Sequence, residues 1–235
     1  MIAWPDPQLP FRTGNSGTLQ RNTGAFANIM DKYKDFSELE QNEREGQDYT
    51  ILFRELDSEI AIMAPHGGGI EPGTLDIADA LAGSDYSFYA FKGIKKTGNK
   101  ILHLTSNGYD EPIGLKISEN ALIVISVHGA RDKGETVFVG GRNQELKQRI
   151  MHALRTAGFT AVISEIPGLR GIKPENICNR CKSGEGVQLE ISRGLREKMF
   201  ENIGRRSLRK KTNMFYNFVN TIKEALVRSR AKITY

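Results

Sequence analysis

The segment from Ala121 to Val127, Ala-Leu-Ile-Val-Ile-Ser-Val, constrains the fold of this chain more than any other. It is an almost continuous apolar and β-branched run, whereas a strand with one face in water alternates apolar and polar residues. Such a run is typical of a strand that is buried on both faces, inside a parallel sheet covered by helices. The run therefore predicts an α/β fold.

Other segments extend this prediction along the chain. We predict further strands at residues 49–56, 59–64, 86–93, 101–106, 136–139, 160–165 and 187–192, and helices at residues 31–46, 73–82 and 143–157. Their alternation predicts a single-domain α/β protein with an open, mixed and mostly parallel sheet and helices on both faces. Two predicted strands adjoin the Asp57-Ser58 turn, and this neighbourhood suggests some antiparallel pairing.

Positive charge is concentrated at the end of the chain. Residues 192–235 hold twelve Lys or Arg against three Glu, although the whole chain carries a net charge of only +5. A basic segment suggests a polyanionic partner, and the alternative is a solvated helical face that binds nothing. Apolar residues recur there at helical spacing and predict an amphipathic helix packed on the core: Leu208, Phe215, Phe218, Val219, Ile222, Ala225 and Leu226.

Signals for export and membrane insertion are missing from the sequence. No run of about 18 apolar residues is present, and residues 1–20 lack the apolar centre of a secretory signal. We therefore expect a cytoplasmic protein without a membrane span. Cys178 and Cys181 have the spacing of half a zinc knuckle, but the second half is missing, which excludes a four-cysteine structural site. Two reduced thiols are expected, with a redox dithiol as the alternative.

Three polar residues follow predicted strands and suggest a metal site. His66 and Glu71 flank a glycine-rich turn after residues 59–64, and His128 follows the run that ends at Val127. Ligands of open α/β sheets bind at the carboxyl ends of the strands. Two imidazoles and a carboxylate suit one catalytic zinc ion with a fourth position open for water. Each histidine alone has a packed core or loop position as its alternative, but together they predict a zinc site.

Other residues are candidates for proton transfer and substrate binding. Glu190 lies within the predicted strand Val187-Gln-Leu-Glu-Ile, where a buried carboxylate must be paired or used. We predict that it is the general base, and the alternative is a salt bridge to Arg193 or Arg196. The candidates for holding an acidic substrate are Arg131, Asn179, Arg180 and His103. His103 lies within the predicted strand 101–106, so a packed histidine is its alternative.

Three motifs resemble the poly-gamma-glutamate hydrolase family of phages and Bacillus. They are Pro65-His-Gly-Gly-Gly-Ile-Glu-Pro-Gly-Thr, Ser126-Val-His-Gly and the long motif that runs from Asn176 to Arg196. The resemblance covers about residues 49–196. It leaves residues 1–48 as a partly ordered N-terminal extension, before a catalytic α/β domain of residues 49–235 that ends in the basic amphipathic helix.

The resemblance implies a zinc-dependent amidase with a fold akin to that of zinc carboxypeptidases. It implies that His66, Glu71 and His128 bind zinc and that Glu190 is the catalytic base. The implied substrate is the capsule polymer poly-gamma-glutamate, and phage-encoded members would be released by lysis. Zinc carboxypeptidases place two residues between the first His and the Glu, whereas four lie between them here, so their specificity residues cannot be transferred.

The leading hypothesis is a monomeric zinc hydrolase acting on an anionic polymer, with no membrane or nucleic-acid partner. The first alternative has the same chemistry on a small substrate, such as an N-acyl or γ-glutamyl amino acid. The second alternative is a nucleic-acid-binding protein that uses the basic residues Arg205, Arg206, Arg209, Lys210 and Lys211. This alternative leaves the histidines and glutamates unexplained.

Overall fold

The computed structural model describes residues 31–230, which contain a seven-stranded sheet. Its strands are β1 (Tyr49–Arg54), β2 (Ile60–Gly68), β3 (Ser87–Gly93), β4 (Ile123–His128), β5 (Thr136–Gly141), β6 (Thr160–Ile163) and β7 (Val187–Ile191). The helices are α1 (Phe36–Asn42), α2 (Thr74–Ala82), α3 (Pro112–Asn120), α4 (Gln144–Thr156), α5 (Arg193–Met199) and α6 (Asn213–Arg230). Short 3₁₀ helices are η2 (Asn99–Leu102), η3 (Pro167–Leu169), η4 (Ile177–Asn179) and η5 (Arg206–Leu208), and β8 (Phe200–Glu201) pairs with β9 (Lys210–Lys211).

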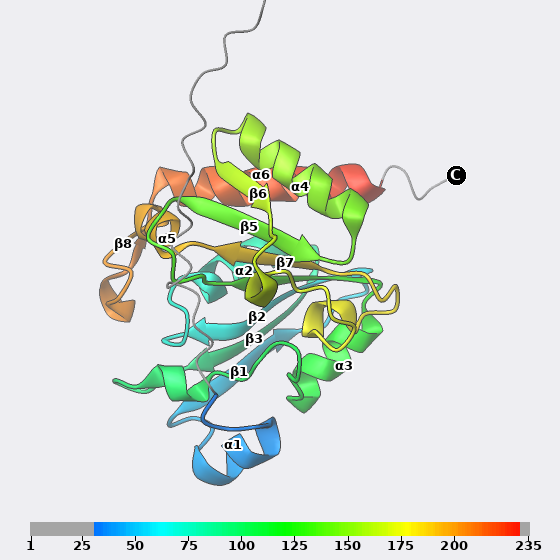
Figure 1. Cartoon of the computed structure of the whole chain (residues 1–235). Helices are drawn as coiled ribbons and strands as arrows, with labels where there is room; N and C mark the ends of the chain where they lie inside the picture. The colour runs from blue at the N-terminus through cyan, green and yellow to red at the C-terminus, as the bar shows by residue number, and fades with distance from the viewer. Residues whose placement is uncertain (1–30, 231–235) are drawn as a thin grey trace, which may run out of the picture.

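The sheet has the strand order β1-β3-β2-β4-β7-β5-β6, which Figure 1 shows from bottom to top. Strands β3, β2, β4 and β7 are parallel, while β1 is antiparallel to β3 and β5 is antiparallel to β7. The predicted mixed, mostly parallel α/β fold is confirmed. The strands on either side of the Asp57-Ser58 turn do not pair with each other, because β3 lies between β1 and β2.

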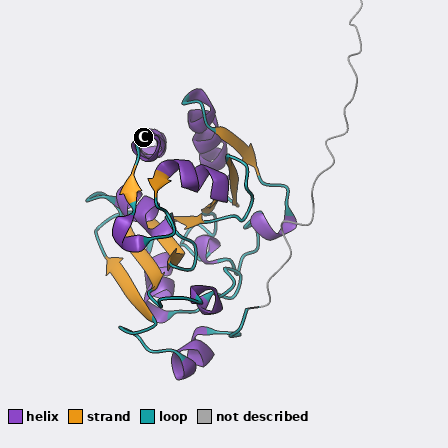
Figure 2. Ribbon diagram, turned by 90° about the vertical axis from the view of Figure 1, so that its left-hand side faces the viewer, coloured by secondary structure: helices purple, strands orange, loops and turns teal. Residues whose placement is uncertain are grey.

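Both faces of the central strands are buried, which explains their unbroken apolar sequences. Along β2, Ile62 packs in a core with α2, α4, α5 and α6, while the next residue, Met63, packs in a second core on the opposite face. The second core includes residues of α1, α3 and η4. Figure 2 shows these helices packed around the strands. Burying a large apolar side chain contributes about 1.5–3 kcal/mol relative to exposing it.

The order of connections makes a switch point beside β2. From β2 the chain crosses through α2 to β3, and from β3 it returns through α3 to β4 on the other side of β2. The loops that leave β2 and β4 therefore diverge at the carboxyl ends of these strands. Such a switch point is the usual ligand site of an open α/β sheet.

The predicted strand 101–106 is wrong, because η2 and an irregular segment occupy this region. Leu102 and Leu104 are buried in the second core, so their apolar character serves packing against the sheet rather than pairing within it. The predicted C-terminal amphipathic helix is confirmed as α6, whose residues Phe215 and Phe218 are buried. Leu208 lies before this helix and is half exposed, so its assignment to the apolar face is wrong.

The N-terminal part of the chain is described from residue 31 onward. Residues 1–30, which belong to the predicted extension, lie outside the described residues. In residues 31–48, Tyr33, Phe36 and Leu39 are buried in the second core, so this part packs against the sheet. Among the described helices, none combines the length and the apolar character that crossing a membrane requires.

Candidate metal centre

A bulge in β2 turns His66 toward the candidate site. In an uninterrupted strand His66 would share a face with Ile62 and Ala64, which pack in the core beside α2. The register changes between the pairs Ala64–Ala90 and Gly67–Lys92, so three steps along β2 oppose two along β3. This bulge carries the His66 ring to the opposite face, where it stacks on His103 at a centroid distance of 4.0 Å.

Glu71 is held by the turn between β2 and α2. Its backbone N–H donates to the carbonyl of His66 at 3.0 Å, and its own carbonyl accepts from the Thr74 hydroxyl at 2.8 Å. Gly68 has φ +68 and a Cβ there would lie 2.4 Å from the Gly93 carbonyl, so only glycine fits this turn. The carboxylate accepts from the backbone N–H of Gly129 at 2.8 Å, which ties the β2 loop to the end of β4.

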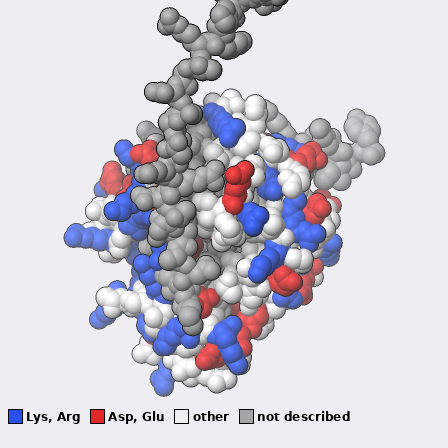
Figure 3. Space-filling model, in the orientation of Figure 1, with Lys and Arg blue, Asp and Glu red and all other residues white. Residues whose placement is uncertain are grey.

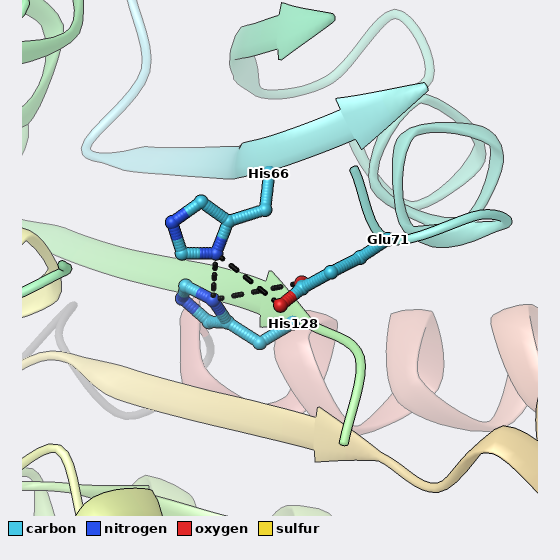
Figure 4. Close-up of side chains that lie close together, drawn as sticks. All are labelled: His66, Glu71 and His128. Atoms are coloured by element: carbon cyan, nitrogen blue, oxygen red, sulfur yellow. Dashed lines mark hydrogen bonds and ion pairs between the residues drawn. The ribbon is translucent and has the colours of Figure 1, made fainter. Parts of the chain in front are cut away.

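The side chains of His66, Glu71 and His128 converge at the carboxyl ends of β2 and β4 (Figure 4). His66 Nδ1 lies 3.1 Å from His128 Nδ1 and 3.4 Å from Glu71 Oε1, and His128 Nδ1 lies 4.0 Å from Glu71 Oε2. The three ligand atoms lie within 4.8 Å of one another. Both histidines are only 2% exposed, whereas Glu71 is 17% exposed and gives the group its contact with solvent.

The surroundings of the two imidazoles suit metal binding. His66 Nε2 lies 2.7 Å from the Leu104 carbonyl, which can only accept, so in the neutral imidazole this nitrogen carries the proton and Nδ1 keeps a free lone pair. His128 Nε2 is buried and has no hydrogen-bond partner among the described residues. A buried imidazole whose only polar contacts are another imidazole and a carboxylate fits a metal ligand better than a core histidine. Two imidazole nitrogens and one carboxylate form a donor set that suits zinc.

The electrostatics of the group leave deprotonated donors at neutral pH. Burial opposes ionisation of Glu71, but the His66 imidazole outweighs it and lowers the pKa of Glu71 to about 2. Burial and the neighbouring His66 lower the pKa of His128 to about 3. Burial disfavours a charged His66, but the Glu71 carboxylate prevails and raises the pKa of this imidazole. One carboxylate and one neutral imidazole are therefore ready to bind a cation.

Glu190 lies beside this group on β7, in register with His128 on β4. It is buried, and its Oε1 accepts a hydrogen bond from Gln188 Nε2 at 2.9 Å. Burial and then the Glu71 carboxylate raise its pKa well above the ordinary value. The alternative of a salt bridge to Arg193 or Arg196 is wrong, since neither arginine donates to this carboxylate.

Sequence patterns indicated no role for Gln188 and named Arg196 only as an alternative partner of Glu190. Gln188 is the partner of Glu190, and the polar pair at alternate positions of an apolar strand was the available signal. Arg196 is buried and donates to the carbonyls of Pro72, Ala130 and Ile191 at 2.7–3.0 Å. It thereby connects the loops that follow β2 and β4, a role that no sequence pattern indicated.

The predicted substrate-binding residues lie in different surroundings. His103 is 35% exposed, stacks on His66 and contacts Asp31 through Nδ1 at 2.6 Å, so it lies at the candidate centre. Arg131 is exposed three residues after His128 and has no hydrogen bond or ion pair with the described residues.

The other two predicted substrate-binding residues contact the protein itself. Asn179 is buried and donates to the carbonyls of Gly171 and Lys173, while its Oδ1 accepts from the Gly186 N–H. Arg180 forms an ion pair with Glu119 at 3.0 Å. These contacts indicate that Asn179 and Arg180 stabilise the loop before β7, and binding of substrate by either residue stays a prediction.

Two of the basic residues near the C-terminal end, Arg206 and Arg209, are bound within the protein. Arg206 donates to the carbonyls of Gly93, Ile94 and Lys95. Arg209 pairs with Asp76 at 2.6 Å and also donates to a backbone carbonyl. On the face shown in Figure 3, basic and acidic side chains are interspersed outside the grey atoms. The described contacts therefore give part of the positive charge a structural role.

The chain is similar in sequence to known proteins. A model of the family described as poly-gamma-glutamate hydrolase matches residues 33–221. YndL, a UPF0714 protein of Bacillus subtilis (strain 168), is 39% identical over 171 residues, which are 72% of this chain and 67% of YndL. YoqZ, a UPF0714 protein derived from prophage SPbeta of the same strain, is 38% identical over 80% of this chain and 69% of its own length.

Solved structures show the same similarity in three dimensions. The structure of a bacteriophage poly-gamma-glutamate hydrolase superposes with a TM-score of 0.82 and 33% identity, over 86% of this chain and 99% of that chain. A zinc-free apo structure of YndL superposes with a TM-score of 0.80 and 36% identity, over 85% of this chain and 99% of that chain. The residues matched by the family model, 33–221, include all seven strands of the sheet and the candidate centre.

Proposed function

This chain belongs to the poly-gamma-glutamate hydrolase family, and from that premise we propose that it is a zinc-dependent hydrolase of the γ-glutamyl amide bonds in poly-gamma-glutamate. The observation that carries the zinc proposal is the convergence of His66, Glu71 and His128 at the carboxyl ends of β2 and β4. Structural cations are commonly enclosed by four protein ligands, whereas three ligands leave a position for water or substrate. This set therefore favours a catalytic ion over a structural one.

In this proposal, His66, His128 and the Glu71 carboxylate would hold one zinc ion. When bound, zinc supplies Lewis-acid chemistry by polarising a carbonyl and lowering the pKa of a water. Contacts within the chain orient two of the proposed ligands. Leu104 orients His66 through Nε2, and the Gly129 N–H orients the Glu71 carboxylate.

Glu190 is the proposed general base. It is the register neighbour of His128, so its carboxyl group emerges beside the proposed ligands on the same face of the sheet. It would take a proton from water at the scissile amide and deliver it to the nitrogen that leaves. A side chain that performs both transfers contributes about 10²–10⁴-fold to the rate.

The proposed substrate is an anionic polymer, which needs cationic or hydrogen-bonding groups around the centre. Arg131 offers an exposed guanidinium after β4, and His103 is partly exposed beside His66. We propose that these two residues contact carboxylates of the polymer and that the protein acts as a monomer. A small N-acyl or γ-glutamyl amino acid is the alternative substrate.

Zinc removal and the E190Q substitution test the proposal. Chelation should abolish cleavage of poly-gamma-glutamate and added zinc should restore it, whereas full activity of metal-free protein would overturn the zinc proposal. E190Q should bind zinc normally and lose at least ~100-fold in kcat. The matched control is E185Q, an exposed glutamate in the loop before β7, which should keep wild-type kcat.

Two further outcomes are informative. An E190Q variant that loses zinc but regains activity in excess zinc would show a structural role for Glu190. A panel of poly-gamma-glutamate, γ-glutamyl dipeptides and N-acyl amino acids distinguishes the substrates. Turnover of the small compounds with none of the polymer would refute the polymer proposal.

A further inference from the structure

Glu190 is contacted by a chain of side-chain amides that begins at a backbone N–H. The Cys178 N–H donates to Asn176 Oδ1 at 3.1 Å, Asn176 Nδ2 donates to Gln188 Oε1 at 3.0 Å, and Gln188 Nε2 donates to Glu190 Oε1 at 2.9 Å. We propose that Gln188 is a positioning residue for Glu190 and that Asn176 fixes the orientation of the Gln188 amide. This inference rests on the proposed role of Glu190 as general base.

The direction of this chain follows from its first member. A backbone N–H can only donate, so the Asn176 atom that faces Cys178 must be the oxygen. The amide nitrogen of Asn176 then faces Gln188, which must answer with its oxygen. The nitrogen of Gln188 is consequently left to donate to the Glu190 carboxylate. Amide orientations are ordinarily assigned from such networks, and here a backbone group fixes both of them.

Burial and packing restrict the hydrogen-bonded amides of Asn176 and Gln188 to this arrangement. Asn176 and Gln188 are each 2% exposed, so water does not compete for their polar atoms. Gln188 and Glu190 are two residues apart on β7 and point to the same face. Gly171 packs against the amide of Gln188 so closely that a Cβ at Gly171 would lie 2.8 Å from Gln188 Oε1.

The second hydrogen of the Asn176 amide forms a longer hydrogen bond. Asn176 Nδ2 also lies 3.3 Å from Asn107 Oδ1, in the loop after η2. These hydrogen-bonded amides therefore connect β7 with two loops that cover the same face of the sheet. This connection gives the long Asn176-to-Arg196 motif a physical role, because its first residue sets the position of its central glutamate.

The Gln188 amide holds the Glu190 carboxylate with a donor that carries no charge. An arginine in the place of Gln188 would also hold the carboxylate, but its charge would compensate that of Glu190 and weaken it as a proton acceptor. An amide holds Oε1 without such compensation. Among the described residues Gln188 alone hydrogen-bonds to this carboxylate, so the second oxygen is left for water or substrate.

Two variants interrupt these hydrogen bonds at different places. Q188L keeps the size of the side chain and removes the donor, so kcat should fall by about 10–100-fold, as for a displaced catalytic group. KM and the zinc Kd should stay within about twofold of wild type. N176D is isosteric, but its carboxylate cannot donate to Gln188 Oε1. Gln188 should then turn its nitrogen toward residue 176 and its oxygen toward Glu190, and kcat should fall in the same way.

The double variant N176D/Q188L tests whether Asn176 acts through Gln188. Its kcat should equal that of Q188L, since the orientation of the amide no longer matters once the amide is gone. Additive losses would show that the two residues act independently and would overturn the inference. The control is V219A, which shortens a buried side chain of α6 in the core on the opposite face of the sheet and should lower the melting temperature without changing kcat.

The outcomes separate this inference from the proposed function. Wild-type kcat in both Q188L and N176D, together with an inactive E190Q, would refute only the positioning role. A fully active E190Q would refute the role of Glu190 itself. If Q188L does not fold, the isosteric N176D decides, because its activity is compared with that of V219A at matched thermal stability.

Discussion

The substitution R196M tests the idea that one buried arginine connects the two loops that carry the proposed ligands. Arg196 is 3% exposed and donates to the carbonyls of Pro72, Ala130 and Ile191. Pro72 follows Glu71 directly, and Ala130 lies two residues after His128. Methionine fills a similar volume but has no donor, so two buried contacts and one partly buried contact to backbone carbonyls would be lost.

The magnitude follows from these three bonds. A hydrogen bond from a charged donor contributes about 1.5–3 kcal/mol, and the low end gives about 4–5 kcal/mol for three. Burial lowers the pKa of Arg196 to about 10, so the group is charged at neutral pH and its removal recovers part of the cost of burying charge. We expect a net loss of about 3 kcal/mol and a melting temperature lower by about 6–12 °C. Zinc should bind about 10–100-fold more weakly, as when a contact that orients metal ligands is lost.

Urea unfolding in EDTA measures the first effect, and competition with a chromophoric chelator measures the zinc Kd. The matched control is R193M on the same helix. Among the described residues the Arg193 side chain pairs only with exposed Glu197, at 2.6 Å, and it should contribute less than about 0.5 kcal/mol. An R196M protein with a zinc Kd within twofold of wild type would refute the connection between Arg196 and the ligands. An unchanged zinc Kd would refute this connection even if the variant were less stable than wild type.

Two further predictions concern the zinc-free protein and a close backbone approach. The folded-state pKa of His128, about 3, lies below its ordinary 6.5, and that of Glu71, about 2, lies below 4.5, so both contribute stability that is lost on acidification. Urea unfolding in EDTA should show the free energy of unfolding falling from about pH 6.5 downward, and H128Q should flatten the upper part of this slope; an unchanged slope would contradict the assignment to His128. A Cβ at Gly186 would lie 1.9 Å from a backbone carbonyl, whereas one at Gly204 meets nothing within 4 Å. G186A should therefore cost about 1–3 kcal/mol or prevent folding, while calorimetry of G204A should give a melting temperature close to wild type.

The fold class could be predicted from the sequence because a strand buried on both faces consists of an unbroken run of apolar residues. The run Ala121–Val127 has no polar alternation, and the structure places most of it in β4 between β2 and β7. The segment 101–106 is also rich in apolar residues, but for a different reason. Its leucines pack onto the face of the sheet, and local apolar composition does not distinguish packing on a sheet from pairing within it.

The sequence by itself determined which residues stand at the ends of strands, and therefore that His66, Glu71 and His128 were candidates for one site. The tertiary structure alone decided how they face one another. The bulge between Ala64 and Gly67 reverses the face of His66, and simple alternation would have turned this ring into the core beside α2.

The partners of the buried polar groups were likewise decided by the tertiary structure. Glu190 is held by Gln188 rather than by an arginine, and Arg196 serves the loops instead. Strand ends and apolar runs are properties of neighbouring residues, so a sequence displays them. Hydrogen bonds between residues 66 and 104, or 196 and 72, depend on strand order, register and loop path, which only the packed chain fixes.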